Sequence, residues 1–362
     1  MPYRLLMTGG GTRGTLSPLL AVADEIRRRD PQTVMHFCVT NTPSEKAFVE
    51  EAGYSAEPFP AGKWRRYVDL RNVVDLAVVV LAFFRALVLL RRFHPDIIVS
   101  AGSFLSVPIA WAAAVYRLPV LIHQQDVELG FANKLMSWTA SMITVTNELT
   151  LKKISQSRAT RVTGNPVRSS MVTGDANRAR HTLSIADALP VLLVLGGSSG
   201  ARFFAELLAA TYQRLVGFCQ IVHVAGRSNV LQVPEHARYR RLPFLERDLA
   251  DVLALADVVV TRAGFSTLSE LAATAKCCVI IPMPKTHQEA NARYFQDHRA
   301  AIVLDQATLA HDDFVATIHN LIQHPQQRAI LGQKMHACSQ PNATQRVADE
   351  VISILQRHGS SS

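Results

Sequence analysis

Cysteine is scarce in this sequence and forms no recognisable pattern. The 362 residues include five cysteines, an odd number, and no Cys-x-x-Cys pair occurs. A disulfide scaffold is therefore not expected, and a reducing cytosol fits this cysteine usage. The 13 histidines form no His-x-x-x-His or His-Glu-x-x-His motif either. The sequence consequently predicts no metal site and no bound cofactor.

Signals for secretion or membrane insertion are also missing. Residues 1–6 lead directly into a glycine-rich turn, without the apolar core of a signal peptide. The apolar stretch Val73–Leu90 is interrupted by Asp75 and Arg85 and makes a poor bilayer span. This stretch is either an amphipathic surface that lies on an anionic leaflet or a buried core helix. Basic side chains flank it at Lys63, Arg65, Arg66, Arg71, Arg91 and Arg92.

Acidic residues are outnumbered, with 29 Asp and Glu against 38 Lys and Arg, which gives a formal net charge of +9. A positive excess suits a polyanion, a phosphorylated substrate or an anionic membrane surface, and does not choose among them. Aromatic residues make up 7% of the chain and form no platform interleaved with basic side chains. No nucleic-acid partner is therefore predicted.

Short aliphatic runs, by contrast, are abundant and are typical of parallel strands covered on both faces. Segments of helical length separate these runs, so the sequence predicts an α/β protein with doubly wound sheets. A chain of this length has room for two domains of about 150–200 residues. The predicted strands are Arg4–Met7, Val34–Val39, Asp96–Ser100, Val120–His123, Val191–Leu195, Ile221–Val224, Asp257–Thr261 and Cys278–Pro282.

The two halves of the chain repeat one pattern. A strand, a glycine-rich turn and a helix at Leu19–Arg29 correspond to a strand, a similar turn and a helix at Arg202–Ala210. Later in each half, a strand and a glycine lead through a helix and another strand to His123-Gln124 or to His287-Gln288. We expect two Rossmann-like domains with a boundary near Gly164, and ligand sites beyond the carboxyl ends of their strands.

The first glycine-rich turn has the spacing G-x-G-x-x-G between a strand and a helix, with Gly11, Thr12 and Gly14 near the helix start. A dinucleotide site would require a carboxylate at the end of the second strand, where Asn41 stands instead. Two interpretations remain open. The turn either presents backbone N–H groups to a phosphate or sugar, or only allows close strand–helix packing.

The second domain carries two further anion-binding candidates. The turn Gly196–Ala201 places Ser198 where its hydroxyl can donate to a diphosphate. The segment Arg262–Glu270 opens a helix that Ser266 or Thr267 can cap, and its N-terminus can hold a phosphate. Glu270, about one turn into the helix, can accept two hydrogen bonds from a ribose. The alternative is that Glu270 is a capping-box residue or one that interacts with the helix dipole.

Polar residues follow two more predicted strands. Arg168, after the turn at Gly164, is either a bidentate ligand for a diphosphate or an ordinary surface arginine. His287, Gln288 and Asn291 follow the strand at Cys278. Imidazole and amide groups offer both donors and acceptors, which suits sugar hydroxyls.

In this order, the motifs resemble those of the MurG family of GT-B glycosyltransferases, and the resemblance covers nearly the whole chain. It rests on residues 9–23, 123–133, 164–168, 196–202, 262–270, 287–291 and 342–348. The resemblance implies a GT-B fold, with two Rossmann-like domains facing across a cleft. Residues 1–163 would form the acceptor and membrane-associating domain, and residues 164–340 the UDP-sugar-binding domain. A C-terminal helix at residues 341–358 would pack back on the first domain.

The family transfers N-acetylglucosamine (GlcNAc) from UDP-GlcNAc to undecaprenyl-pyrophosphoryl-N-acetylmuramyl-pentapeptide (lipid I), which gives lipid II. The resemblance implies a metal-independent, inverting enzyme of peptidoglycan synthesis. It also implies a peripheral protein at the cytoplasmic face of the cell membrane, with the 73–92 region on the anionic inner leaflet. Arg168 and Ser198, with the helix start at Ser266 and Thr267, would hold the UDP diphosphate. Other implied contacts are Leu245 near the uracil, Glu270 on the ribose, and His287, Gln288 and Asn291 on the GlcNAc hydroxyls.

Two positions depart from the family pattern. Thr15 stands where the family usually has a histidine in the first loop, and threonine is not a base near neutral pH. By its place in that loop, we still expect Thr15 in the catalytic group with Asp126 and His123. The family's His-Glu-Gln-Asn is here His123-Gln124-Gln125-Asp126, with the carboxylate moved to the last position. Asp126, helped by His123, is therefore our candidate for the general base; alternatively it only hydrogen-bonds the sugar. A GT-B enzyme with another acceptor, or a non-catalytic nucleotide-sugar sensor, remains an alternative function.

Overall fold

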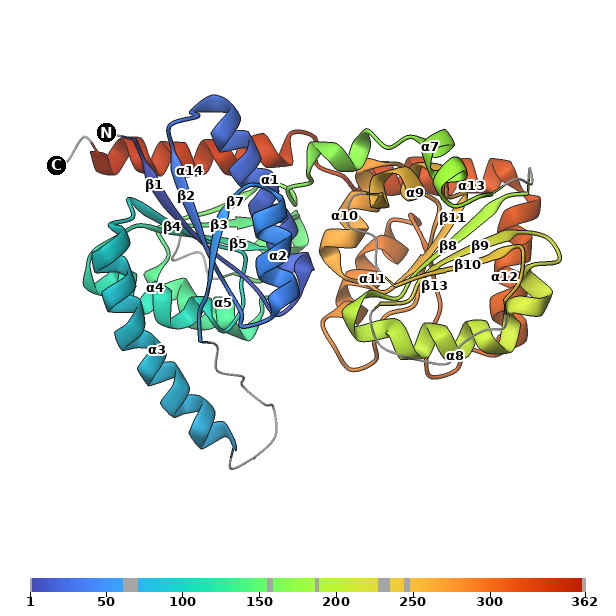
Figure 1. The fold of residues 1–362 in the computed structure, drawn as a ribbon, viewed down its shortest axis with the longest axis horizontal. Helices are drawn as coiled ribbons and strands as arrows, with labels where there is room; N and C mark the ends of the chain where they lie inside the picture. The colour runs from blue at the N-terminus through green and yellow to red at the C-terminus, as the bar shows by residue number, and fades with distance from the viewer. Residues whose placement is uncertain are drawn as a thin grey trace. The chain divides into compact units, whose positions relative to one another are not determined.

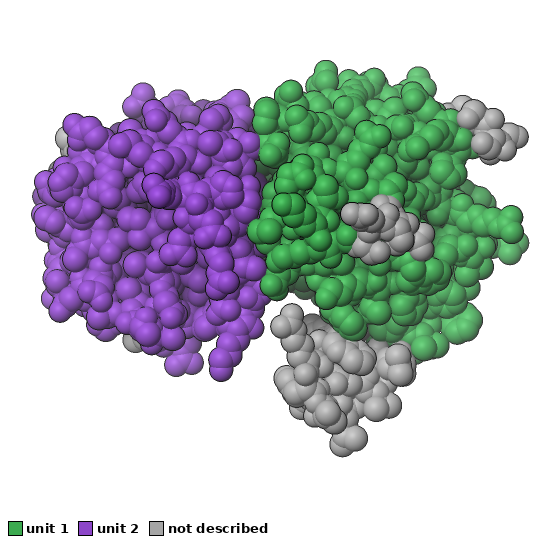
Figure 2. All heavy atoms as spheres, turned by 180° about the vertical axis from the view of Figure 1, so that it is seen from behind, with its two compact units in different colours: residues 1–168, 340–362 green, residues 169–339 purple. Residues whose placement is uncertain are grey.

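The computed structural model describes residues 2–60, 71–154, 159–185, 189–226, 235–243 and 248–359, with the backbone alone for residues 71–77 and 198–201. The chain divides into two compact units, which Figure 2 colours separately. Unit 1 comprises Met1–Arg168 and Gln340–Ser362, and unit 2 comprises Ser169–Ser339.

Unit 1 is built on a seven-stranded parallel sheet (Figure 1). The strand order is β3-β2-β1-β4-β5-β6-β7, so the first strand lies inside the sheet and the chain reverses direction between β1 and β4. The carboxyl ends of β1, β4 and β5 therefore lie at one edge, where ligands of such folds bind. The strands are β1 (Arg4–Thr8), β2 (Val34–Val39), β3 (Ser55–Pro58), β4 (Ile97–Ser100), β5 (Val120–Gln124), β6 (Met142–Val145) and β7 (Thr160–Val162).

Alternate residues of these strands enter two cores, one on each face of the sheet. Leu5 and Met7 of β1 pack in one core with α1 and α14, whereas Leu6 packs in the other with α3, α4 and α5. Burial on both faces explains why the central strands are continuous aliphatic runs. The helices are α1 (Arg13–Arg29), α2 (Pro43–Glu51), α3 (Arg71–Phe93), α4 (Ser106–Val115), α5 (Phe131–Met136), α6 (Glu148–Leu151) and α14 (Ala343–Gly359), with a 3₁₀ turn η1 (Ser137–Thr139).

Unit 2 contains a six-stranded parallel sheet in the order β10-β9-β8-β11-β12-β13. Its strands are β8 (Val191–Leu195), β9 (Gln220–Val224), β10 (Tyr239–Leu242), β11 (Val258–Thr261), β12 (Cys278–Ile280) and β13 (Ile302–Val303). Its helices are η2 (Ser169–Val172), α7 (Ala176–Thr182), α8 (Gly197–Leu215), α9 (Leu249–Leu255), α10 (Phe265–Ala273), α11 (Gln288–Asp297), α12 (His311–Gln323) and α13 (Pro325–Ala337). The first six strands of unit 1 follow the same order, which confirms the prediction of two Rossmann-like domains.

The start of the second unit differs from the boundary that the sequence suggested. Residues 164–168 belong to unit 1 because they are tied to the start of α14. A Cβ on Gly164, whose φ is +84°, would lie 2.3 Å from Cβ of Gln340. Thr344 donates to the carbonyl of Val167 and accepts from its N–H. The segment therefore packs against α14, which contributes Val347 to the core of unit 1.

Helix α3 carries apolar side chains on two faces. Ala82, Ala86 and Leu89 are buried in the core of unit 1. Val80, Leu81, Phe84 and Val88 are between 50% and 69% exposed. The interpretation as a wholly buried core helix is therefore wrong for the described part of α3. Within the part of the chain that the structure describes, no helix is long and apolar enough to cross a bilayer.

Candidate functional site

The glycine-rich turn between β1 and α1 is closely packed on one side and open on the other. A Cβ on Gly10 would lie 2.8 Å from Cγ2 of Thr40, so only glycine fits this approach. Gly11 has a φ of +89° and open space where a Cβ would lie. Thr12 is the N-cap of α1 but makes no side-chain capping bond, and Gly14 lies in the helix's first turn. The turn is therefore closely packed at Gly10 and open at Gly11, and its predicted contact with a phosphate or sugar stays a prediction.

Thr15 braces this turn. Its hydroxyl lies 2.9 Å from the carbonyl oxygen of Thr12 and 3.2 Å from that of Gly10, close enough to donate to either. Because these bonds are internal to the turn, the side chain holds the backbone in place. The structure therefore offers Thr15 a positioning role, and its predicted place in the catalytic group stays a prediction.

His123, on β5, is buried with both ring nitrogens hydrogen bonded. Nε2 lies 2.9 Å from Oδ1 of Asn165, and Nδ1 lies 2.9 Å from Oγ1 of Thr144. An amide oxygen only accepts, so Nε2 carries the proton and Nδ1 accepts from the threonine hydroxyl. Burial lowers the pKa of His123 to about 4, against the opposing effect of the Asn165 hydrogen bond. This arrangement disfavours a proton-carrying role and favours a positioning role.

Asp126 lies in the loop after β5, and the side chain of Gln124 holds that loop. Nε2 of Gln124 donates to the carbonyls of Asp126 and Glu128, at 2.8 Å each. Oε1 of Gln124 accepts from Nδ2 of Asn133 on α5, at 2.6 Å. Asp126 is a half-buried residue that follows the carboxyl end of β5. Gln124 therefore fixes the backbone that carries Asp126.

Arg168 lies against the ring of Phe48 on α2. Its Cζ is 5.1 Å from the ring centroid, and its Nε is shielded from solvent. The side chain is half-buried, unlike an ordinary surface arginine, which would extend into water. Stacking of this kind fixes the plane of a guanidinium while leaving its N–H edge able to bind an anion.

In unit 2, the turn after β8 leads directly into α8. Gly197 has a φ of +58°, and the N–H of Gly196 donates to the carbonyl of Val224 at the end of β9. The predicted contacts of two residues fall outside what the structure describes. Ser198 is described by its backbone alone, and Leu245 lies outside the described residues.

Helix α10 follows β11 at the carboxyl edge and begins at Phe265, before either of the caps, Ser266 or Thr267, that the sequence suggested. Its N-cap is Gly264, which makes no side-chain capping bond. The expectation that Ser266 or Thr267 caps this helix is wrong, because both side chains lie inside its first turn. Glu270 is the sixth residue of α10, beyond the N3 position that a capping box requires. It is buried, at 7% exposure, so the capping-box interpretation is also wrong.

Arg262 directly follows β11 and stabilises this edge of the sheet through hydrogen bonds. Its Nη1 lies 3.0 Å from the carbonyl of Ile281, 3.2 Å from that of Pro282 and 2.7 Å from Oε1 of Gln306. Its guanidinium also lies over the rings of Phe203 and Phe204 on α8. The arginine thus ties β11 to the segment after β12 and to the helix that follows β8.

Two polar residues of α11 hydrogen bond to the backbone of Ala263, just before α10 begins. Oε1 of Gln288 accepts from the N–H groups of Ala263 and Met283, and Nδ2 of Asn291 donates to the carbonyl of Ala263 at 2.9 Å. Asn291 is fully buried and Gln288 nearly so, whereas His287 is exposed. In this structure both amides fix the turn that enters α10, and their predicted contacts with the sugar stay predictions.

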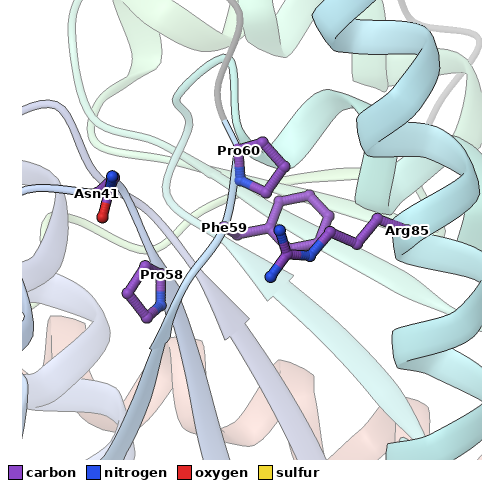
Figure 3. A pocket seen from close by; sticks show the side chains of 5 residues that line it. All are labelled: Asn41, Pro58, Phe59, Pro60 and Arg85. Carbon is purple, nitrogen blue, oxygen red and sulfur yellow. The ribbon is translucent and has the colours of Figure 1, made fainter.

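A separate small pocket of about 240 Å³ opens beside α3 (Figure 3). Asn41 follows β2, Pro58 ends β3, Phe59 and Pro60 continue from it, and Arg85 reaches in from α3. Among the predicted site residues whose side chains the structure describes, none lines this pocket.

Several supporting residues carry no sequence motif of their own. Thr144, Asn165 and Asn133 act through hydrogen bonds to residues more than eight positions away in the chain. Thr144 lies in β6, Asn165 follows β7 and Asn133 lies in α5, and their pairing depends on how these elements pack. Only the folded chain shows which polar groups meet.

Two family models match the chain. The N-terminal domain of glycosyltransferase family 28 matches residues 5–145, and its C-terminal domain matches residues 191–351. The first match lies within unit 1, and the second covers the sheet of unit 2 and reaches into α14.

Curated relatives match over most of their own length. The chain is 33% identical over 342 residues to the UDP-N-acetylglucosamine–N-acetylmuramyl-(pentapeptide) pyrophosphoryl-undecaprenol N-acetylglucosamine transferase of Treponema denticola, covering 88% of each chain. It is 29% identical to the enzyme of the same name from Clostridium botulinum, covering 89% of this chain and 91% of that one. Among solved structures, MurG of Acinetobacter baumannii superposes with a TM-score of 0.72 at 25% identity, covering 97% of this chain and all of the other.

Proposed function

The chain belongs to the MurG family of glycosyltransferases, and we propose on this premise that it transfers GlcNAc from UDP-GlcNAc to lipid I, forming lipid II for peptidoglycan synthesis. The observation that carries this proposal is the 33% identity to a relative of that name across 88% of both chains. The family models match residues of both units, and the activity is that of a UDP-GlcNAc-dependent hexosyltransferase.

Unit 2 binds the sugar nucleotide in this proposal. Helix α10 starts at the carboxyl end of β11 with no side chain capping its first N–H groups, so these groups can bind a phosphate oxygen. Glu270 lies on the second turn of the same helix and accepts from the ribose hydroxyls. Gln288 and Asn291 hold the backbone of Ala263 and so fix the entry to the helix. A helix N-terminus with a nearby carboxylate recognises a phosphorylated ribose.

The transfer is a single displacement with inversion. The C4 hydroxyl of the acceptor attacks C1 of the sugar, the bond from C1 to the diphosphate oxygen breaks, and UDP leaves. The hydroxyl proton passes to Asp126, whose loop Gln124 holds in place. His123 stays neutral and orients β5 against Asn165. Arg168 stabilises the negative charge that develops on the diphosphate.

The protein works at the cytoplasmic face of the cell membrane, where a polyprenyl-linked acceptor is embedded. The exposed residues Leu81, Phe84 and Val88 form one apolar face of α3, and Arg91 and Arg92 lie exposed at its end. A helix with an apolar face and a cationic border binds the surface of an anionic leaflet. The same region thus brings the enzyme to its substrate.

A transfer assay tests the activity. The protein is incubated with UDP-GlcNAc and a short-chain lipid I analogue, and UDP release and the mass of the lipid product are measured. We expect UDP release only with both substrates present, and a product heavier by one GlcNAc. Turnover only with a different acceptor would assign the chain to another reaction of the fold. Donor binding without turnover on any lipid-linked acceptor would make it a nucleotide-sugar sensor.

A further inference from the structure

Ser103 has a backbone conformation that differs from that of every other non-glycine residue in the described part of the chain. It lies in the loop between β4 and α4, and its φ is +106°. The other seven described non-glycine residues with positive φ have values between 49° and 60°, inside the left-handed helical region. Ala275 and Arg299 are examples, each two residues beyond the end of a helix. A φ of +106° lies outside that region, where only glycine is free of strain.

Hydrogen bonds hold this strained loop on both sides. On one side, Thr8 of β1 donates to Oγ of Ser106 at 2.7 Å, and that hydroxyl donates to the carbonyl of Gly102 at 3.3 Å. On the other side, Nε2 of Gln125 donates to the carbonyl of Ala101 at 3.4 Å. A strained residue persists only where its surroundings fix it in this way, and such residues cluster at functional sites.

The loop lies at the topological switch point of unit 1. The sheet order places β4 beside β1, where the chain reverses direction, and ligands of such folds bind at this point. A Cβ on Gly10, in the turn after β1, would lie 3.1 Å from Cδ2 of Leu105, so the two loops are in contact. Gln125 joins the same loop to the segment that carries Asp126. Ser103 therefore belongs to a loop that contacts both the glycine-rich turn and the segment of the proposed base.

The side chain of Ser103 is half-buried, and its hydroxyl forms no hydrogen bond with the residues that the structure describes. Glycine would adopt this φ without strain, so the hydroxyl is what serine adds here, at a cost in stability. We propose that the hydroxyl of Ser103 binds a neutral oxygen of the acceptor's sugar, beside the hydroxyl that attacks the donor. A hydroxyl both donates and accepts, which matches the hydroxyl and acetamido groups of an N-acetylated sugar.

A neutral sugar suits this position better than a phosphate. Residues 101–105 include no arginine or lysine. The charged residue of the segment that Gln125 joins to this loop is Asp126, and a carboxylate repels a phosphate. This inference rests on the proposed function, since the acceptor's sugar carries the hydroxyl whose proton passes to Asp126.

The test compares Ser103→Gly with Ser103→Ala in the full-length protein. Glycine removes both the hydroxyl and the strain, whereas alanine removes the hydroxyl and keeps the strain. Ser184 is the matched control, because it is a serine of unit 2 with a φ of 51°. Steady-state kinetics give KM for the lipid I analogue and for UDP-GlcNAc. Titration gives the affinity for the lipid I analogue and for a short-chain polyprenyl pyrophosphate, which lacks the sugar, and thermal unfolding gives the stability.

We expect both Ser103 variants to raise KM for the lipid I analogue and to weaken its binding by about 3- to 10-fold, as loss of a neutral hydrogen bond does. KM for UDP-GlcNAc and the affinity for the polyprenyl pyrophosphate should not change. Ser103→Gly should unfold about 2–4 °C above the wild type, because relief of strain exceeds the entropy that glycine adds to the unfolded chain. Ser103→Ala should show no such gain, and Ser184→Gly and Ser184→Ala should leave both KM values unchanged.

The proposal is overturned if both folded Ser103 variants match the wild type in KM and affinity for the lipid I analogue. It is also overturned if the polyprenyl pyrophosphate loses affinity to the same degree, since the hydroxyl would then contact the diphosphate. A Ser103→Gly protein that unfolds no higher than the wild type would overturn it as well, since the backbone would then be unstrained. Failure of the proposed function gives a different result. The wild type would then bind the lipid I analogue without transferring GlcNAc to it, and the titrations would still test Ser103.

Discussion

The imidazole of His123 and the amide of Asn165 are joined by a 2.9 Å hydrogen bond that links β5 to the segment after β7. The two residues are 42 positions apart, and both are buried. Because Nδ1 also bonds Thr144, the ring is held on both sides in its neutral form. The bond positions the strand whose loop carries Asp126.

Replacing this histidine by His123→Gln should reduce the sensitivity of the fold to acid. Burial lowers the pKa of His123 from 6.5 to about 4, so between these values the unfolded chain takes up a proton that the folded chain excludes. Wild-type stability is therefore complete above pH 6.5 and falls as pH drops toward 4, by about 2 kcal/mol between pH 7 and pH 5 from this group. Urea denaturation at both pH values measures the difference.

The wild type and His123→Gln both retain His223, and burial lowers the pKa of this second histidine to about 4 as well. The comparison of the two proteins therefore isolates the effect of His123. Equal losses of stability in wild type and variant would contradict the neutral, buried assignment. A positioning role further predicts that the pH limbs of kcat/KM stay where they are in the variant.

The role of Asp126 is tested by Asp126→Asn. A general base contributes about 10²–10⁴-fold, so kcat should fall by at least about 100-fold while the affinity for UDP-GlcNAc is unchanged. Glu128→Gln, an exposed carboxylate in the same loop, is the control and should retain full activity. A loss of less than about tenfold would leave Asp126 only a hydrogen-bonding role on the sugar.

Glu270→Gln should act on donor affinity. Loss of a charged acceptor for the ribose hydroxyls costs about 10- to 100-fold, read as a rise in KM for UDP-GlcNAc with a smaller change in kcat. Glu206→Gln on α8, whose carboxylate pairs with Arg202 in solvent, should leave KM unchanged. An unaltered KM in folded Glu270→Gln would remove this residue from the donor site.

Arg262→Met should destabilise unit 2 because it leaves three acceptors at the strand edge without their donor. Removing a buried charged donor of this kind costs about 3 kcal/mol. Arg214→Met, which removes an exposed ion pair with Asp312, should cost less than about 1 kcal/mol. Chemical denaturation of both variants measures these values, and similar small losses would mean that Arg262 does not brace the edge.

Membrane docking through α3 is tested with Leu81→Glu/Phe84→Glu. Charges on this exposed face should lower binding to anionic vesicles by at least about tenfold, since each large side chain contributes about 1.5–3 kcal/mol when buried. Turnover of a water-soluble acceptor analogue should be unchanged. Ile330→Glu, on the exposed surface of α13, is the matched control. Unchanged vesicle binding in the double variant would place the docking surface elsewhere.

Most of the buried strands could be predicted from sequence, whereas the edge strands and the buried strand β6 could not. All eight predicted strands occur, because central parallel strands are continuous aliphatic runs. The sheet edges β3 (Ser-Ala-Glu-Pro), β7, β10 (Tyr-Arg-Arg-Leu) and β13 are short or polar, and β6 is only four residues long. Their pairing comes from neighbouring strands rather than from their own composition.

The features of the candidate site also divide into those that the sequence predicts and those that only the folded chain shows. The glycine-rich turns and the helix after β11 were predictable because each follows an aliphatic run. The hydrogen bonds of Gln288 and Asn291 to the backbone of Ala263 were not, because they depend on how α11 packs beside α10. The stacking of Arg13 and Arg168 on Phe48 joins three separate segments and has no sequence signal.

The most direct test is a crystal structure of the protein with UDP-GlcNAc bound. We predict that the ribose hydroxyls lie within hydrogen-bond distance of the carboxylate of Glu270 and that the diphosphate lies at the start of α10. Uridine bound in unit 1, or no bound nucleotide at a saturating concentration, would contradict the account.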